Sequence, residues 1–317
     1  MGTPAPVSGL QLRLLRWFAR HGRATLPWRT QRSPYRTVVS EFMLAQTQVE
    51  RVIPKFEAFT ERYADFFALA RAPLADVLRE WRGLGYNSRA VRLHRLARIV
   101  VAQYDGALPA GEPALRSLPG IGPYTLAAIR AFAFDVADAP VDTNVRRIVH
   151  RLFFGVEHPP AAAPAVLDER ARSLVPRDRA HDWSSALMDL GALICTARAP
   201  KCLLCPLRGD CRAAPVDAAA LEVARGANAK PRGPQTAIPF ERSRRYARGR
   251  IVDRLRTLPP GERISLLDLT AEVQPQLPGR TSEELGELIA ALERDGLVSC
   301  AARGIALAES SEGLDAR

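Results

Sequence analysis

The sequence has few lysines, few cysteines and no long apolar run. Lysine provides only three of the 45 basic residues. No apolar segment approaches the ~20 residues that span a bilayer, and the N-terminus lacks a basic segment followed by an apolar stretch and a cleavage site. We therefore expect a cytoplasmic protein without membrane contact.

The composition is that of a soluble globular protein, with 47% hydrophobic and 25% charged residues. This excludes disordered, collagen-like and coiled-coil chains, and a length of 317 residues predicts two domains. The formal net charge is +11, and residues 217–317 hold 15 basic and 15 acidic side chains, so the surplus lies in 1–216. Such a surplus predicts a polyanionic partner, although biased codon usage in an Arg-rich and Ala-rich chain would give the same charge.

Four of the five cysteines lie within 17 residues, in the pattern C-x6-C-x2-C-x5-C. They are Cys195, Cys202, Cys205 and Cys211. In a chain without a signal peptide, such crowding indicates metal ligation rather than disulfides. Four thiolates can hold one zinc ion or one [4Fe-4S] cube. Zinc modules usually use two C-x2-C pairs and this segment has one, which favours the cluster.

Apolar residues at three- and four-residue spacing predict short helices throughout 9–213. From Ala213 to about Phe240 the chain is rich in Ala, Gly and Pro, which indicates a linker, and its end is rich in arginine. Beyond it the pattern predicts three helices, over 243–257, 265–273 and 281–295, and two strands, over 297–300 and 304–307. That order is similar to a small winged-helix module. Residues 251–317 carry a net charge of −5, which argues against phosphate binding, so packing or protein docking is as compatible with the module as DNA contact.

Three features of the helical region could carry chemistry. Leu118 to Thr125 join two helices through a turn in which glycines let backbone N–H groups approach a phosphate, although a plain helix corner has the same pattern. Asp142 lies where an N-cap begins the next helix, and such an aspartate often has no further role. Glu41 lies in an apolar stretch of a helix, so its carboxylate faces either a solvated stripe or a cleft.

In this order the features resemble the helix-hairpin-helix DNA glycosylase superfamily with an iron-sulfur cluster, and most closely the MutY-type adenine DNA glycosylases. The resemblance covers about 9–213. It rests on Leu26-Pro27-Trp28-Arg29, Val39-Ser40-Glu41, Gln46-Thr47-Gln48-Val49, Gly83-Leu84-Gly85-Tyr86, the hairpin, Asp142 to Arg147, Met188 to Ala192 and the cysteine loop. It implies an all-α fold of two subdomains with an iron-sulfur loop, here followed by the winged-helix-like module. The expected boundaries are 1–30 with 137–216 for the iron-sulfur subdomain, 31–136 for the six-helix barrel, 217–242 for the linker and 243–317 for the module.

By this resemblance Glu41 is the general acid and Asp142 the carboxylate that steadies the sugar. Two carboxylates suit this reaction, because adenine leaves readily only when protonated while the sugar develops positive charge. Tyr124 stands where bifunctional relatives carry a lysine nucleophile, and no lysine lies between Lys55 and Lys201. This predicts a monofunctional enzyme that leaves an abasic site. Packing at a helix start is the alternative role for Tyr124.

The resemblance also assigns contacts with a flipped-out base and with DNA. The expected DNA-binding residues are Gln46, Tyr86, Gly120, Gly122 and Thr125. Trp28 and Arg29 match residues near the adenine pocket, where this chain has Ser185 in place of the family's usual Gln or Glu. The family's Nudix-like C-terminal domain, which helps to recognise 8-oxoguanine, is replaced by the winged-helix-like segment.

The function implied is base excision repair: removal of adenine mispaired with 8-oxoguanine or guanine from double-stranded DNA, by a monomer with a [4Fe-4S] cluster. In a bacterium it would be associated with the nucleoid. The alternative is a mismatch-specific thymine/uracil DNA glycosylase, whose family also has an iron-sulfur loop and a hairpin tyrosine. A non-catalytic DNA-binding or redox-sensing protein is a third hypothesis, against which the two intact carboxylates argue.

Overall fold

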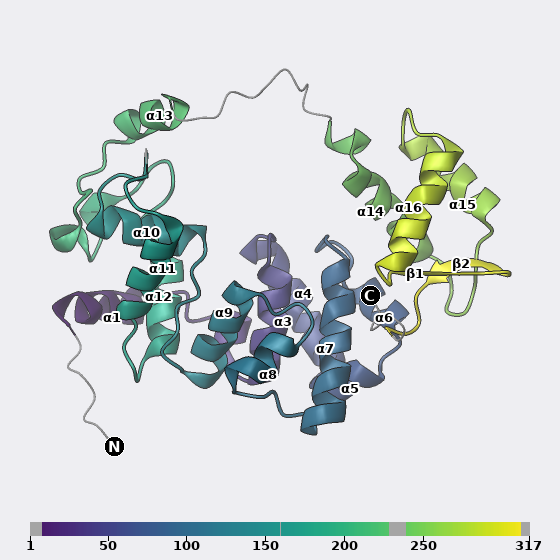
Figure 1. The fold of residues 1–317 in the computed structure, drawn as a ribbon, viewed down its shortest axis with the longest axis horizontal. Coiled ribbons are helices and arrows are strands. Elements are labelled where there is room, and N and C mark those ends of the chain that lie inside the picture. The colour runs from purple at the N-terminus through teal and green to yellow at the C-terminus, as the bar shows by residue number, and fades with distance from the viewer. Residues whose placement is uncertain (1–7, 159, 228–238, 312–317) are drawn as a thin grey trace. The chain divides into compact units, whose positions relative to one another are not determined.

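The chain is mainly helical (Figure 1), as expected for the fold class. The computed structural model describes residues 8–158, 160–227 and 239–311. The expected subdomain, linker and module also include 1–7, 159, 228–238 and 312–317, which lie outside the described residues. None of the described helices combines the length and apolar character needed to cross a membrane.

The helices up to the cysteine loop are short and closely spaced. They are α1 (Gly9–His21), α2 (Pro27–Thr30), α3 (Pro34–Leu44), α4 (Val49–Arg62), α5 (Phe66–Arg71), α6 (Leu74–Glu80), α7 (Ser88–Tyr104), α8 (Glu112–Ser117), α9 (Pro123–Phe134), α10 (Thr143–Phe153), α11 (Pro164–Ser173) and α12 (Ala180–Leu193). Two 3-10 turns, η1 (Cys202–Leu204) and η2 (Arg208–Asp210), follow in the cysteine loop.

Contacts between residues divide the chain into two units. The first contains 1–38, 110–117 and 121–231, and the second contains 39–109, 118–120 and 232–317. The C-terminal residues thus share a unit with α4 to α7. The subdomain boundaries inferred from the sequence remain a prediction.

The first unit is built around α12, on which both α1 and α10 pack. In α10, buried Val145, Ile148, Val149 and Leu152 recur at the three- and four-residue spacing of an amphipathic helix. They meet Trp183 and other buried residues of α12 in a single apolar core. This core fixes the start of α10, where Asp142 lies, relative to the end of α12, where the cysteine loop begins.

The C-terminal part of the second unit has the element order expected from the sequence. It consists of η3 (Phe240–Arg242), α14 (Arg244–Leu255), α15 (Leu266–Val273), η4 (Gln274–Gln276), α16 (Ser282–Arg294) and the hairpin of β1 (Val298–Ala301) and β2 (Gly304–Leu307). The strands are antiparallel, and an isolated bridge joins Ile264 to Ile305. The three helices lie beside this hairpin (Figure 1).

Several hydrogen bonds fasten the C-terminal part to α6 and α7. The buried Arg256 donates to the Leu78 carbonyl at 2.8 Å and to Asn87 Oδ1 at 2.8 Å. The Leu74 amide donates to the Glu309 carbonyl at 3.0 Å. Because these bonds lie near both ends of the C-terminal part, this part packs within the second unit and is not connected to it by the linker alone.

The segment interpreted as a linker contains more structure than its composition suggested. Helix α13 (Ala218–Ala227) lies within 217–242, and its Leu221 is buried. Alanine is the strongest helix former, so an Ala-rich run can fold where one apolar side chain finds a core. Most of the arginines at the end of the expected linker belong to α14, which begins at Arg244 with Ser243 as its N-cap.

Candidate active site and iron-sulfur site

Asp142 is the N-cap of α10. Its Oδ1 accepts from the Val145 amide at 2.7 Å, and its Oδ2 accepts from Asn144 Nδ2 at 2.8 Å. The side chain is half-buried and lies at the positive end of the helix dipole. The capping role considered from the sequence is therefore present, and it holds the carboxylate in one orientation.

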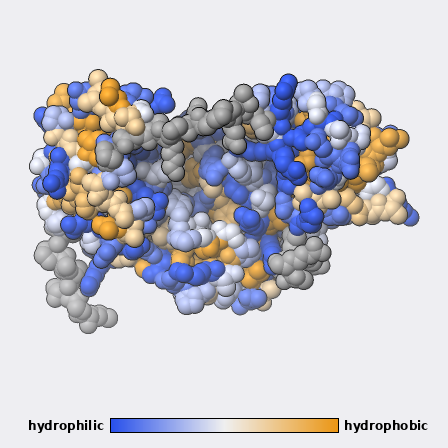
Figure 2. All heavy atoms as spheres, turned by 45° about the horizontal axis from the view of Figure 1, so that its top comes forward, coloured by the Kyte–Doolittle hydropathy of each residue, from blue (hydrophilic) through white to orange (hydrophobic). Residues whose placement is uncertain are grey.

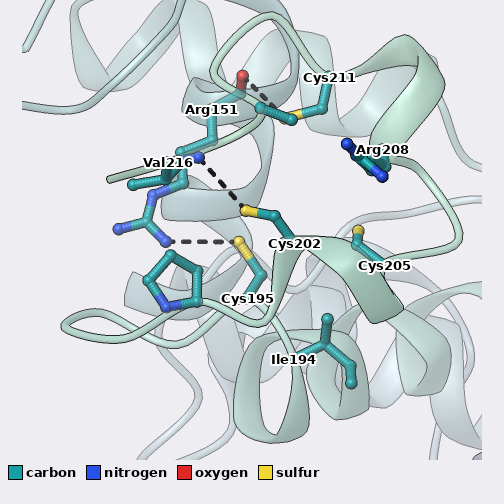
Figure 3. Close-up of a pocket in the computed structure, with 10 residues that line it drawn as sticks. Arg151, Ile194, Cys195, Cys202, Cys205, Arg208, Cys211 and Val216 are labelled. Carbon is teal, nitrogen blue, oxygen red and sulfur yellow. Dashed lines mark hydrogen bonds between the residues drawn. The ribbon is translucent and has the colours of Figure 1, made fainter. Parts of the chain in front are cut away.

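The four cysteines surround a common cavity (Figure 3). Cys195 follows directly on the end of α12, and the other three lie on and around η1 and η2. Among the described residues, no three His, Cys, Asp or Glu side chains are arranged to hold a single metal ion, whereas four thiols around one cavity suit the corners of a larger cluster. Burial raises the pKa of the Cys205 thiol to about 11, so a metal at this position must displace the thiol proton.

Two arginines of α10 hold the cysteine loop, and their role was not predicted from the sequence. Arg147 donates to the carbonyls of Cys195 at 2.8 Å and Gly191 at 2.9 Å. Arg151, only 1% exposed, donates to the Thr196 carbonyl at 2.8 Å and to Cys195 Sγ at 3.6 Å. The four-residue spacing that puts both on one face of α10 was the available signal.

Arg151 keeps its charge through an ion pair. It forms two hydrogen bonds with Glu157, at 2.6 and 2.7 Å. Burial alone lowers the pKa of Arg151, but the bonds with Glu157 outweigh it and the net shift is upward. The helix that carries Asp142 at its start therefore also carries a permanent cation beside the cysteine cavity.

Arg29, expected near the base pocket, forms a buried ion pair with Asp189 of α12. Asp189 has no exposed surface, and its two oxygens accept from Arg29 at 2.8 and 3.2 Å and from Arg23 at 2.8 Å. Burial opposes the ionised form, yet the bonds from Arg29 and Arg23 lower the pKa of Asp189. Trp28 is half-buried and Ser185 is buried on α12. A base-contacting role for these residues remains a prediction.

Glu41 belongs to the second unit, whereas Asp142 and Tyr124 belong to the first. The Glu41 side chain is half-buried on α3, and its neighbours Val39 and Met43 are fully buried. Its position in an apolar stretch of helix thus agrees with the sequence.

The turn before α9 has the close packing expected of the hairpin. Gly120 has a φ of +84°, and a Cβ there would lie 2.7 Å from the Phe42 ring, so only glycine fits. Gly122 is the N-cap of α9 and Pro123 its first residue. The first-turn amides of a helix have no earlier carbonyl to bind, and the turn exposes Gly120, Gly122 and Tyr124, with Thr125 half-buried.

The structure brings the loops of Gln46 and Tyr86 together. Both side chains are exposed, and both residues have left-handed backbone, with φ of 59° and 45°. Thr47 Oγ1 donates to the Leu84 carbonyl at 3.2 Å, which links the loop after α3 to the loop before α7. The two expected wedge residues therefore lie on adjoining loops of one unit.

The buried Arg89 of α7 fastens these loops, and sequence reasoning missed it. Its guanidinium donates to the carbonyls of Phe42, Met43 and Ala45 at the end of α3 and to those of Leu84 and Gly85, at 2.5 to 3.1 Å. Burial lowers the pKa of Arg89 to about 10, so it is charged at neutral pH. The negative end of α3 compensates part of that charge.

Comparison with known proteins identifies the family. A model of the HhH-GPD superfamily of base excision DNA repair proteins matches residues 39–172, and a model of the iron-sulfur binding domain of endonuclease III matches 195–211. An adenine DNA glycosylase of Mycolicibacterium smegmatis is 46% identical over 200 residues, which are 63% of this chain and 67% of that protein. The chain belongs to the HhH-GPD superfamily.

Other members of the superfamily show the same extent of similarity. An adenine DNA glycosylase of Mycobacterium tuberculosis (strain H37Rv) is 44% identical over 198 residues, or 61% of this chain and 64% of that protein. The structure of a thermostable thymine-DNA glycosylase aligns with a TM-score of 0.58 and 33% identity, covering 63% of this chain and 93% of that one. The chain thus spans about two thirds of each mycobacterial relative. The match at 195–211 identifies the four cysteines as an iron-sulfur site and agrees with a [4Fe-4S] cofactor.

Proposed function

We propose that the protein is an adenine DNA glycosylase that removes adenine mispaired with 8-oxoguanine or guanine from double-stranded DNA and acts as a monomer. The observation that carries the proposal is the 46% identity with a relative named adenine DNA glycosylase. The basic surplus of 1–216 supports a polyanionic substrate.

Glu41 is the proposed general acid. An adenine anion is a poor leaving group, so a proton must reach the base as the glycosidic bond breaks. A carboxyl on a largely buried stretch of helix is suited to give this proton, because low polarity disfavours its charged form. The water that completes the hydrolysis adds to the sugar, and the proton it loses returns to solvent.

Asp142 is the proposed stabiliser of the sugar cation. Its carboxylate stands at the start of α10 and is oriented by the Val145 amide and Asn144, so its oxygens are held in place to meet a developing positive charge. Tyr124 stands at the start of α9, and the three lysines of the chain lie at 55, 201 and 230. Without a lysine at the hairpin, the product is an abasic site in an uncut strand.

Cys195, Cys202, Cys205 and Cys211 would hold the [4Fe-4S] cluster, which when bound supplies a rigid crosslink for the loop. The residues of the chain that respond to it are Arg147 and Arg151. Both connect the loop to α10, so the loop supports the helix that presents Asp142.

A thymine or uracil mismatch glycosylase is the second candidate. It is favoured by the 33% identity with the structure of a thermostable thymine-DNA glycosylase. The test is release of free base from duplexes containing A:8-oxoG, A:G, T:G or U:G by the full chain. Release of adenine from the first two supports the proposal, and release of thymine or uracil alone replaces it with the alternative.

A further inference from the structure

One arginine of the C-terminal segment lies directly on the expected wedge residue. The Arg245 guanidinium of α14 stands 4.2 Å from the centroid of the Tyr86 ring, and its Nη1 donates to the Tyr86 hydroxyl at 2.7 Å. Both residues belong to the second unit. The aromatic ring that would enter DNA is thus held by a residue about 160 positions away in the sequence, far beyond local effects.

The surroundings of this contact have the chemistry of a nucleic-acid surface. A groove lies between the loop Gly85–Ser88 and α14, lined by Tyr86, Phe240, Arg245, Tyr246 and Arg248 among others. Arg245 also lies 5.6 Å from the ring of Phe240, which is 53% exposed. Aromatic faces beside unneutralised guanidinium groups bind nucleotides by stacking and by charge.

Arg245 has no acidic partner among the described residues, a property it shares with Arg244 and Arg250 of the same helix. Arg248 pairs with Asp295 and Arg254 with Glu272, whereas Arg245 forms no ion pair with a described residue. Hydrophilic side chains are abundant over the C-terminal helices, to the right in the space-filling view (Figure 2). The net negative charge of the module therefore does not extend to this end of α14.

Tyr86 needs support because of its backbone. A φ of 45° is uncommon for a bulky residue, and Gly83 and Gly85 on the same loop also have positive φ, at 91° and 71°. Arg89 donates to the Leu84 and Gly85 carbonyls of this loop, and its guanidinium lies 5.6 Å from the centroid of the Tyr86 ring. Arg245 is the contact that fixes the hydroxyl end of the ring.

We propose that Arg245 positions Tyr86 for entry into the base stack, which makes α14 part of the DNA-reading surface of this protein. The inference rests on the proposed function, in which Tyr86 is the wedge. Arg245 touches no reacting atom and is a positioning residue. Its partner is duplex DNA at an opened base pair.

The experiment uses the full chain and a duplex with 2-aminopurine opposite 8-oxoguanine. The rise in 2-aminopurine fluorescence reports base opening, and duplex affinity and free-base release are measured separately. The variants are Arg245→Ala, Tyr86→Ala and the double variant. Arg244→Ala is the matched control, since this exposed residue of the same helix carries the same charge and has no contact with Tyr86.

We expect Arg245→Ala to reduce the opening signal by about fivefold to tenfold, as loss of a cation–π contact and a hydrogen bond would. The double variant should be no worse than Tyr86→Ala, because the arginine acts through the tyrosine. Arg244→Ala should leave opening unchanged. Arg245→Lys should keep the duplex affinity of the wild type, because the positive charge remains, but should not recover base opening, because an ammonium group lacks the planar guanidinium that contacts the Tyr86 ring and hydroxyl.

Additive losses in the double variant, or equal losses for Arg244→Ala and Arg245→Ala, would overturn the inference and reduce Arg245 to a surface charge. Thermal melts and iron content exclude misfolding of each variant as the cause. If the wild type opens the 2-aminopurine pair with this coupling but releases no adenine from a matching A:8-oxoG duplex, the proposed function fails and the positioning role stands. If the wild type releases adenine but the Arg245 and Tyr86 variants show no coupling, the proposed function stands and the positioning role of Arg245 fails.

Discussion

Replacement of Arg89 by methionine tests whether one buried guanidinium organises the two loops, those of Gln46 and Tyr86, that are proposed to contact DNA. Methionine keeps the apolar stem but removes every donor. Of the carbonyls that Arg89 binds, those of Phe42, Met43 and Leu84 belong to buried residues. Those of Ala45 and Gly85 belong to exposed residues and can bind water instead. The Leu84 carbonyl keeps the Thr47 hydroxyl as a donor, so the variant leaves two buried acceptors, the carbonyls of Phe42 and Met43, without one.

Each buried acceptor without a partner costs about 1–3 kcal/mol, and removal of a buried cation recovers part of that cost. With two such acceptors, we expect Arg89→Met to lower the free energy of unfolding by roughly 2–4 kcal/mol. Urea denaturation followed by circular dichroism measures this change, with the duplex affinity of the folded fraction as a second readout. Arg92→Met is the control, because Arg92 is exposed on the same helix and should change stability by less than about 0.5 kcal/mol. A loss below about 1 kcal/mol in Arg89→Met would refute the role assigned to these carbonyls.

Three further predictions concern the carboxylates, the cluster and pH. Glu41→Gln should abolish base release and leave duplex affinity within a few fold, because it removes the transferable proton and little binding surface; turnover at the wild-type rate would exclude Glu41 from the mechanism. Asp142→Asn should also lose most activity. If that variant keeps full turnover and only unfolds at a lower temperature, Asp142 is a helix cap and nothing more. Protein purified anaerobically should show broad absorbance near ~400 nm and about four irons per chain, and Cys202→Ser should lower iron content and DNA affinity together, whereas stoichiometric zinc would contradict the cluster. Burial lowers the pKa of His94 from its ordinary 6.5, so the unfolded chain binds the proton more readily and stability should fall as the pH drops below 6.5 toward the lower pKa of the folded protein. Unfolding titrations at several pH values should show a weaker dependence in His94→Gln, and an equal dependence would exclude His94.

Local features of the fold were predictable where one short segment determines them. The strands and helices of the C-terminal module were expected within one or two residues of their bounds, because capping residues such as Ser243 and Thr281 stand at the helix starts. Helix α13 was missed because an Ala-rich composition is shared by linkers and helices. The docking of 244–311 on α6 and α7 was also missed. It depends on bonds such as Arg256 to Leu78 that no local pattern encodes.

The same limit applies to the candidate site. Residues proposed to act through their own chemistry, such as Asp142, and the four cysteines of the iron-sulfur site have a position or spacing that is visible in the sequence. Supporting residues do not, since Arg89 and Arg151 are two of many arginines until burial distinguishes them. In an arginine-rich sequence, the few arginines that are buried and hydrogen-bonded to backbone carbonyls cannot be distinguished from the many that are exposed to solvent.

The acidic balance of the C-terminal module illustrates why net charge is a weak guide to a surface. From a charge of −5 over 251–317 we expected little phosphate binding, but several acids of the module pair with its own arginines, as Asp253 does with Arg256 and Glu272 with Arg254. Such pairs cancel in the sum and contribute little to the field at a distance, so a net charge does not show where on the surface the remaining charges lie. The unpaired Arg245 lies just outside the counted range, at the start of α14 and against Tyr86. What DNA meets at that end is set by which charges remain unpaired, and a cut near residue 250 would divide α14 instead of separating a module from a linker.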